Sequence, residues 1–374
     1  MKKNLRSLFP ILVFSTLFVG SIQAVFAQNT AKKDSKPKKS RVNLKAASLP
    51  LITETPVVYK ASKSQKGQFF RIEVPQNQFV RLQVNQIGID VKVEVRGPDN
   101  RLIQEMDSLT GYGGVEEIQF VSQLSGIHRV EIIFLPPLPP QSQEMIEIWR
   151  DPFRVPHEQD RETAKAHDLL YSGLGALLSG DFNQARGKLE QALAIFSRYQ
   201  CTEREAYTHF LLGQVTLELA LATNPDPTNK TKVVEEIADE SLNHFTQASD
   251  LWIKADPEKN KRNVALSLSG LAKVQLSLKK YTEASSNSKK ALTIYQEVND
   301  IWLEIDELLL LGIAQQKAGA NWQASLNLET ALGKKDLDQY QSKFYLDGLI
   351  AMGFALTKSV HMGLEQSKTI GLCR

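Results

Sequence analysis

The sequence predicts a multi-domain protein in which an N-terminal antiparallel β-sandwich is followed by an all-α array of helical hairpins. Two observations predict this fold class. Between residues 50 and 150, apolar and polar residues alternate with a period of two, which is typical of strands with one solvated face. Between residues 160 and 374, small residues recur at fixed offsets of 12 and 7 positions, which indicates a structural repeat.

Composition limits the class of protein. The chain has 374 residues, of which 42% are hydrophobic and 23% are charged, as in ordinary soluble proteins. The formal net charge is only +3, so no nucleic-acid partner is expected. Two cysteines, Cys201 and Cys373, are too few for a disulfide framework or a four-thiolate zinc site.

Residues 1–27 have the organisation of a signal peptide. Lys2, Lys3 and Arg6 make a positive start, a mostly apolar run follows from Leu8 to Ile22, and small residues precede the expected cleavage after Ala27. An uncleaved anchor is the alternative, but the apolar run is shorter than the roughly 20 residues that span a bilayer. We therefore expect an exported protein, periplasmic or extracellular, with association with the cell envelope as a further option.

Residues 28–49 are expected to form a basic, flexible linker. Lysine and arginine dominate the stretch, and Asp34 is its single acid, so it cannot bury enough apolar surface to fold. Residues 32–45 could make weak contact with an anionic surface, although a solvated linker is the simpler interpretation.

Residues 50–150 are expected to form the β-sandwich. Its clearest strand has Ile89, Val91, Val93 and Val95 on one face and charged residues on the other, and a turn follows at residues 97–100. Further strands are predicted at 70–74, 80–84, 118–120, 130–134 and 145–149, with the proline run 136–140 as a loop. Acids at Asp90, Asp99, Asp107, Glu116 and Glu117 lack the spacing of a calcium loop, and no metal or cofactor is expected.

The sequences GQFF at 67–70, QIGIDV at 86–91, GPDN at 97–100 and SGIHRV at 125–130 resemble the bacterial pre-peptidase C-terminal domain. More closely, they resemble the version found ahead of helical repeats in secreted proteins that end in a caspase-like CHAT domain. His128 departs from the tyrosine that is usual at its position in that family. The resemblance implies an accessory role in adhesion, targeting or spacing, and no catalysis.

Residues 160–374 are expected to form about four helical hairpins and a partial fifth. Small residues at the contact positions let paired helices approach closely, to about 8–10 Å. An ordinary helical bundle is the alternative, but the three identical 12-plus-7 offsets argue against it. The predicted packing positions are Gly173, Ala185 and Ala192; Gly213 and Ala248; Ala272, Ala284 and Ala291; and Gly312, Ala324 and Ala331.

These positions resemble those of tetratricopeptide repeats, so the expected architecture is a tetratricopeptide-repeat superhelix with a concave binding groove. The resemblance implies a protein or peptide partner, whose identity stays open. Members that clamp carboxylate tails carry a set of Lys, Asn and Arg residues that is not found here. The candidate groove residues, each of which could instead be simply solvated, are Gln214, Glu218, Lys273, Ile313, Gln316 and Lys317.

No catalytic constellation is found. Neither cysteine stands in a protease motif, the six histidines show no metal spacing, and neither a phosphate loop nor a nucleophile elbow occurs. We therefore expect an exported, non-catalytic scaffold for protein–protein interaction, with no small-molecule substrate. The alternative is the regulatory front half of a caspase-like (CHAT) protease system, truncated here or completed by another chain.

Overall fold

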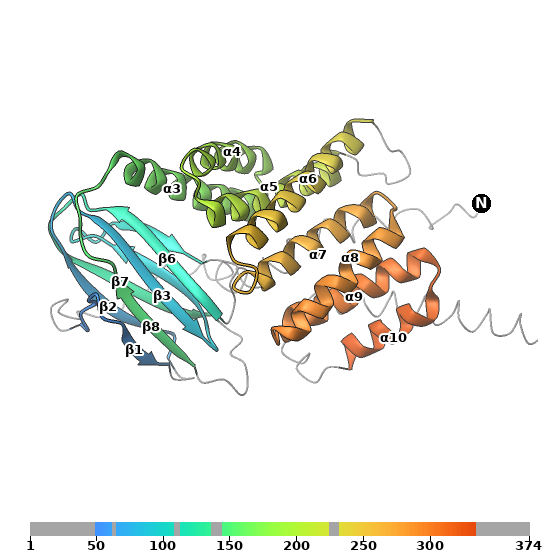
Figure 1. The fold of residues 1–374 in the computed structure, drawn as a ribbon, viewed down its shortest axis with the longest axis horizontal. Helices are drawn as coiled ribbons and strands as arrows, with labels where there is room; N and C mark the ends of the chain where they lie inside the picture. The colour runs from blue at the N-terminus through green and yellow to red at the C-terminus, as the bar shows by residue number, and fades with distance from the viewer. Residues whose placement is uncertain (1–48, 62–64, 108–112, 136–143, 224–231, 334–374) are drawn as a thin grey trace, which may run out of the picture. The chain divides into compact units, whose positions relative to one another are not determined.

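The computed structural model describes residues 49–61, 65–107, 113–135, 144–223 and 232–333. Within these residues, eight strands precede eight helices, which confirms the predicted fold class of a β-sandwich followed by an all-α part (Figure 1). The chain divides into two compact units, one of residues 25–179 and 183–201 and the other mainly of residues 202–374. The predicted signal peptide, almost all of the linker, the proline run 136–140 and the partial fifth repeat lie outside the described residues.

The β-sandwich consists of two four-stranded sheets in which every neighbouring pair of strands is antiparallel. One sheet has the order β1-β8-β3-β6, and the other has the order β2-β7-β4-β5. The strands are β1 (Val57–Lys60), β2 (Gly67–Val74), β3 (Phe79–Ile87), β4 (Asp90–Arg96), β5 (Leu102–Met106), β6 (Gly113–Val121), β7 (Gly126–Leu135) and β8 (Met145–Arg150).

The alternating pattern places the core between the two sheets. The inward residues of β4 are fully buried, while Lys92 and Glu94 lie on its other face and pair with each other. The predicted turn joins β4 to β5: the Asn100 N–H donates to the Gly97 carbonyl at 2.9 Å, and Asn100 takes the left-handed conformation that asparagine tolerates.

Two strands, β1 and β5, were not predicted. Both are short strands at the edge of a sheet, where the side chains meet fewer neighbours and the alternation is weak. In β5, the inward positions are taken by Gln104 and Met106, and a register shift separates Val95 from Arg96 on the neighbouring strand.

Two helices, α3 (Glu158–Leu178) and α4 (Phe182–Arg198), belong to the same compact unit as the sandwich. Helix α3 packs on β5 and β6, and Tyr171 lies against the core of the sandwich. At its start, the Asp160 carboxylate accepts the His157 N–H at 2.7 Å and pairs with Arg154. This capping arrangement anchors the helix to the segment that follows β8.

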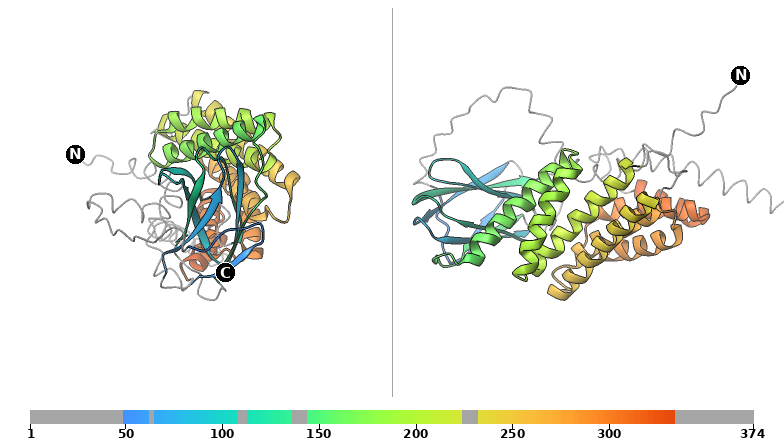
Figure 2. Two further views of the ribbon diagram at one scale, coloured as in Figure 1. Left: turned by 90° about the vertical axis from the view of Figure 1, so that its left-hand side faces the viewer. Right: turned by 90° about the horizontal axis from the view of Figure 1, so that it is seen from above.

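The second unit contains six consecutive helices: α5 (Thr202–Thr223), α6 (Lys232–Ala255), α7 (Lys261–Ser277), α8 (Tyr281–Glu297), α9 (Ile301–Ala318) and α10 (Asn321–Leu332). Each packs against the next in chain order, and α7 also contacts α5 and α9 (Figure 2). The helices therefore form three hairpins, and the first helix of the middle hairpin, α7, contacts the first helices of the other two, α5 and α9.

Within the hairpins, a small residue on the first helix meets a large one on the second. A Cβ added at Gly312 would lie 2.6 Å from Leu328 Cγ, and one added at Gly213 would lie 3.0 Å from the Phe245 ring. In the hairpin of α7 and α8, where Ala272 replaces glycine, the matching position holds the small, fully buried Ser288. The size of one partner thus compensates for the size of the other.

The longer spacing between Gly213 and Ser241 is partly helical. The sequence predicts an inserted loop for the extra residues, near 222–237, because the prolines at 225 and 227 break a helix. Helices α5 and α6 instead extend to 22 and 24 residues, against 17 in both α7 and α8. The prolines at 225 and 227 lie outside the described residues.

Trp322 lies two residues before Ala324, whereas Tyr281 lies three before Ala284, and this difference predicts a one-residue shift of the turn before α10. The structure shows no such shift. Helix α10 begins at Asn321, three residues before Ala324, as α8 begins three before Ala284. Asn321 is buried there, and Trp322 is 73% exposed. Gly319, in the left-handed conformation, ends α9 so that the register is kept.

The packing of glycine against a large side chain predicts that Gly312→Ala destabilises the hairpin of α9 and α10. The new methyl group would overlap Leu328, and overpacking of this kind costs about 1–3 kcal/mol. Hydrogen exchange of the α9 amides measures the effect. Leu328→Ala should remove part of the penalty, so the double variant should be more stable than the sum of the single changes predicts.

Gly187→Ala is the matched control, because nothing lies within 4 Å of a Cβ added at this helical glycine. This change should be neutral or should stabilise α4 by up to about 1 kcal/mol. Equal losses at Gly187 and Gly312 would contradict the packing argument.

Candidate functional site

The repeat-packing residues all lie in the interior of the structure. The eight alanines are 0% exposed, and the three glycines are buried with them. These residues hold the helices together and present no atoms to a ligand. They are Gly173, Ala185, Ala192, Gly213, Ala248, Ala272, Ala284, Ala291, Gly312, Ala324 and Ala331.

The six candidate groove residues do not lie together. Gln214 and Glu218 of α5 are buried, and Lys273 of α7 is partly buried. Ile313 instead packs into an apolar cluster with Ala272, while Gln316 and Lys317 lie at more exposed positions of α9. Of these six, the structure brings Glu218 and Lys273 into electrostatic interaction, and Gln214 lies one turn before Glu218 on α5.

Two acids of α9 that were not predicted complete this group. Lys273 interacts electrostatically with Glu218 on one side and with Asp306 and Glu307 on the other. We refer to Gln214, Glu218, Lys273, Asp306 and Glu307 as the inner polar cluster. Asp306 and Glu307 directly precede the apolar run Leu308–Leu311 of α9, and acids beside such a run are the sequence signal that could have revealed them.

The two buried glutamates of the cluster are shifted toward their neutral forms. Burial raises the pKa of Glu218 to about 7, against the opposing attraction of Lys273. Burial likewise raises the pKa of Glu307 to about 7, although Ser288 and Ser269 donate hydrogen bonds to its carboxylate. Burial also lowers the pKa of Lys273. The cluster thus holds more negative charge than its single cation balances.

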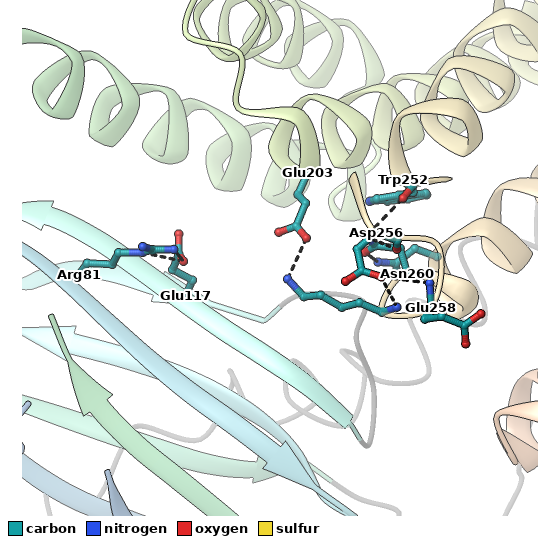
Figure 3. Close-up of polar contacts among 9 residues, drawn as sticks. Arg81, Glu117, Glu203, Trp252, Asp256, Glu258 and Asn260 are labelled. Carbon is teal, nitrogen blue, oxygen red and sulfur yellow. Dashed lines mark hydrogen bonds and ion pairs between the residues drawn. The ribbon is translucent and has the colours of Figure 1, made fainter. Parts of the chain in front are cut away.

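A compact connection holds α5 and α7 in register. After α6, the Asp256 carboxylate accepts the backbone N–H groups of Glu258 and Lys259 at 3.1 and 3.0 Å. The Asn260 side chain donates to the carbonyls of Trp252 and Asp256, which joins the end of α6 to the start of α7 (Figure 3). Lys259 then pairs with Glu203 in the first turn of α5 at 2.8 Å.

A histidine pair joins the two helices of the first hairpin in this unit. His209 Nδ1 of α5 lies 2.9 Å from His244 Nδ1 of α6, so one nitrogen must donate a proton and the other must accept it. Burial, together with His244, lowers the pKa of His209 to about 4. His244 also lies 3.7 Å, Nε2 to Oε1, from Glu240 on its own helix. The contact therefore requires at least one neutral imidazole.

Three of the acids of the sandwich, Asp90, Asp107 and Glu116, lie near one another. Burial raises the pKa of Asp107 well above its usual range, and the nearby Asp90 and Glu116 add to the shift. Among the residues that the structure describes, no group of three or more His, Cys, Asp or Glu residues could hold a metal ion. Cys201 is partly buried, and its Sγ donates to the Tyr199 carbonyl oxygen at 3.8 Å, while Cys373 lies outside the described residues.

The class of protein follows from these features: one unit combines a β-sandwich with a helical hairpin, and the other is an array of three helical hairpins with polar residues enclosed between its first helices. A scan against protein-family models finds no match, and a search of curated proteins finds none either. In the described part of the chain, no helix combines the length and apolar character needed to cross a membrane.

A search of solved structures finds a similarity to the pre-peptidase C-terminal domain of a collagenase from Bacillus anthracis. The two share 10% sequence identity with a TM-score of 0.23, and the match covers 27% of this chain and 93% of that chain. At this score the similarity carries no argument about family or function.

The histidine pair predicts that acidification destabilises the hairpin of α5 and α6. Because the folded pKa of His209 is about 4, below the usual 6.5, the unfolded chain binds more protons between these values. Stability should be complete above pH 6.5 and should fall by up to about 3 kcal/mol as the pH drops toward 4. Hydrogen exchange of the α5 and α6 amides between pH 4 and 7.5 measures this slope.

His209→Phe should flatten the slope, because it removes the group that must lose its proton on folding. His157→Gln, in the other unit, is the control and should leave the exchange of α5 and α6 unchanged. An undiminished slope in His209→Phe would show that other groups control the acid response.

Proposed function

We propose that the protein is an exported, non-catalytic scaffold that binds a protein partner on its helical hairpins. The observation that carries the proposal is that neighbouring first helices, α5 with α7 and α7 with α9, contact each other as well as their own partners. Repeats that stack in this way present successive first helices as one extended surface, and repeat proteins use such surfaces to bind other proteins.

The resemblance of the small-residue spacing to tetratricopeptide repeats supports the same proposal. Glu218, Ser277 and Lys317 stand at matching positions of α5, α7 and α9, five residues after Gly213, Ala272 and Gly312. The charge at this position differs between hairpins: Glu218 is buried in the inner polar cluster, whereas Lys317 is exposed. The sandwich, which resembles a pre-peptidase C-terminal domain in its motifs, is proposed to space or target the array.

Site-specific photo-crosslinking tests the scaffold proposal. A photoreactive residue at Lys317, on the exposed part of the first-helix surface, should capture a defined protein from the native cell envelope. The same residue at Lys290, exposed on the second helix α8, is the matched control and should not capture it. Capture of no protein at Lys317, or of the same proteins from both positions, would overturn the proposal.

Export is part of the proposal and has its own test. Expression of the full chain in a bacterial host should give a mature protein in the periplasm or medium whose N-terminus is Gln28. Changing Ala27 to Phe should block processing, because the cleavage site needs a small residue. Recovery of the full-length chain from the cytoplasm alone would contradict export.

A further inference from the structure

The inner polar cluster contains three buried acceptor atoms that find no donor. They are Oε1 of Gln214, Oε1 of Glu218 and Oε1 of Glu307, and within the described part of the chain none has a hydrogen-bond partner. The three residues are 1%, 3% and 1% exposed. A buried acceptor without a donor is costly, and such atoms are rare unless something outside the chain satisfies them.

The chemistry of the cluster specifies what that missing group must be. Three carboxylates, those of Glu218, Asp306 and Glu307, surround the single cation of Lys273. All three unpartnered atoms are acceptors, so a guest must donate hydrogen bonds, and the nearby carboxylates favour a donor that carries positive charge. An anion, such as the carboxylate tail of a peptide, would meet the same acceptors and be repelled.

The cluster lies where a guest could be bound by more than one hairpin. Glu218 belongs to α5 and Glu307 to α9, and α7, which carries Lys273, contacts both helices. The Glu307 carboxylate is further fixed by Ser269 of α7 and Ser288 of α8. A group bound here therefore contacts residues of successive first helices, so its binding depends on how those helices are placed relative to one another.

We propose that this cluster is the specificity site of the array, and that it accepts a basic side chain, arginine or lysine, of the partner protein. This inference rests on the proposed function and names its partner's chemistry. An arginine guanidinium suits the site especially well, because its five N–H donors can serve several acceptors at once.

Protonation supports the same assignment. With pKa values of about 7, Glu218 and Glu307 are partly neutral at physiological pH, and an arriving cation would favour their ionised forms and release protons. The other charged or titratable groups that face Glu307 are Lys273, Asp306 and Tyr295, and Lys273 also faces Glu218. Tyr295 in turn interacts electrostatically with Arg262 and Asp300.

Titration of the full chain with matched peptides tests the proposal. The probes are capped glycine-serine octapeptides with one central arginine, lysine, citrulline or glutamate, and binding is followed by calorimetry and by shifts in amide NMR signals. The arginine and lysine peptides should bind, and the citrulline and glutamate peptides should bind at least tenfold more weakly. As the pH rises from 6 to 8, each glutamate that ionises should increase the affinity for the arginine peptide about tenfold. Equal binding of arginine and citrulline peptides would overturn the proposal.

Variants test whether binding depends on these particular carboxylates or on the overall negative charge of the chain. Glu218→Gln and Glu307→Gln should each weaken binding of the arginine peptide at least fivefold and reduce the pH dependence of that binding. The matched control is Glu283→Gln, which removes the same charge from an exposed position of α8 and should change nothing. Lys273→Gln should bind the arginine peptide at least as tightly as the unchanged chain, because it removes the internal competitor. A loss of affinity in Lys273→Gln equal to that in Glu218→Gln would show that the substitutions only damage the fold.

Two further measurements distinguish a peptide site from a small-cation site, and the specificity site from the scaffold function. If agmatine, a free guanidinium compound, binds as tightly as the arginine peptide, the site is for a small cation and the peptide assignment is overturned. If Lys317 crosslinks a partner whose binding is unaffected by Glu218→Gln and Glu307→Gln, the scaffold function stands and the specificity site falls. Both proposals survive only if a captured partner loses affinity in these two variants and keeps it in Glu283→Gln.

Discussion

The close approach of each first helix to its second helix is the constraint on which the helical unit depends. Gly312 leaves room for Leu328, and Gly213 leaves room for Phe245, so that neither pair could accept an added methyl group without displacement. Interiors packed at this density determine helix separation from side-chain volume. Once that separation is set within a hairpin, the first helices of successive hairpins are brought against each other.

This contact between first helices encloses polar groups that an apolar core would not need. Hydrophobic replacements of a buried ionic cluster are often neutral or stabilising, so the cluster of Glu218, Lys273 and Glu307 contributes little to folding. Its carboxylates are desolvated and only partly compensated, which makes them receptive to a donor. We propose recognition, and not stability, as the role of this arrangement.

Pattern and periodicity predicted the central strands and the helical hairpins, because burial on one face leaves a strong periodic signal. The edge strands β1 and β5 were missed, since their side chains meet neighbours on one side only. Gln214, Glu218 and Lys273 were predicted to line an exposed groove, but the structure buries Gln214 and Glu218. Asp306 and Glu307 were not predicted, because their position opposite Lys273 depends on how two separate hairpins meet, and no local spacing records that.

The sequence by itself determined the sandwich, the order of the elements and the small residues that pair the helices, because each of these depends on contacts within or between neighbouring segments. Only the tertiary structure decided that α3 and α4 join the sandwich, through Tyr171 and the pair of Arg154 with Asp160. It alone decided which polar residues become buried together. Burial and its effect on pKa are properties of residues far apart in the chain, and they exist only once the hairpins are packed.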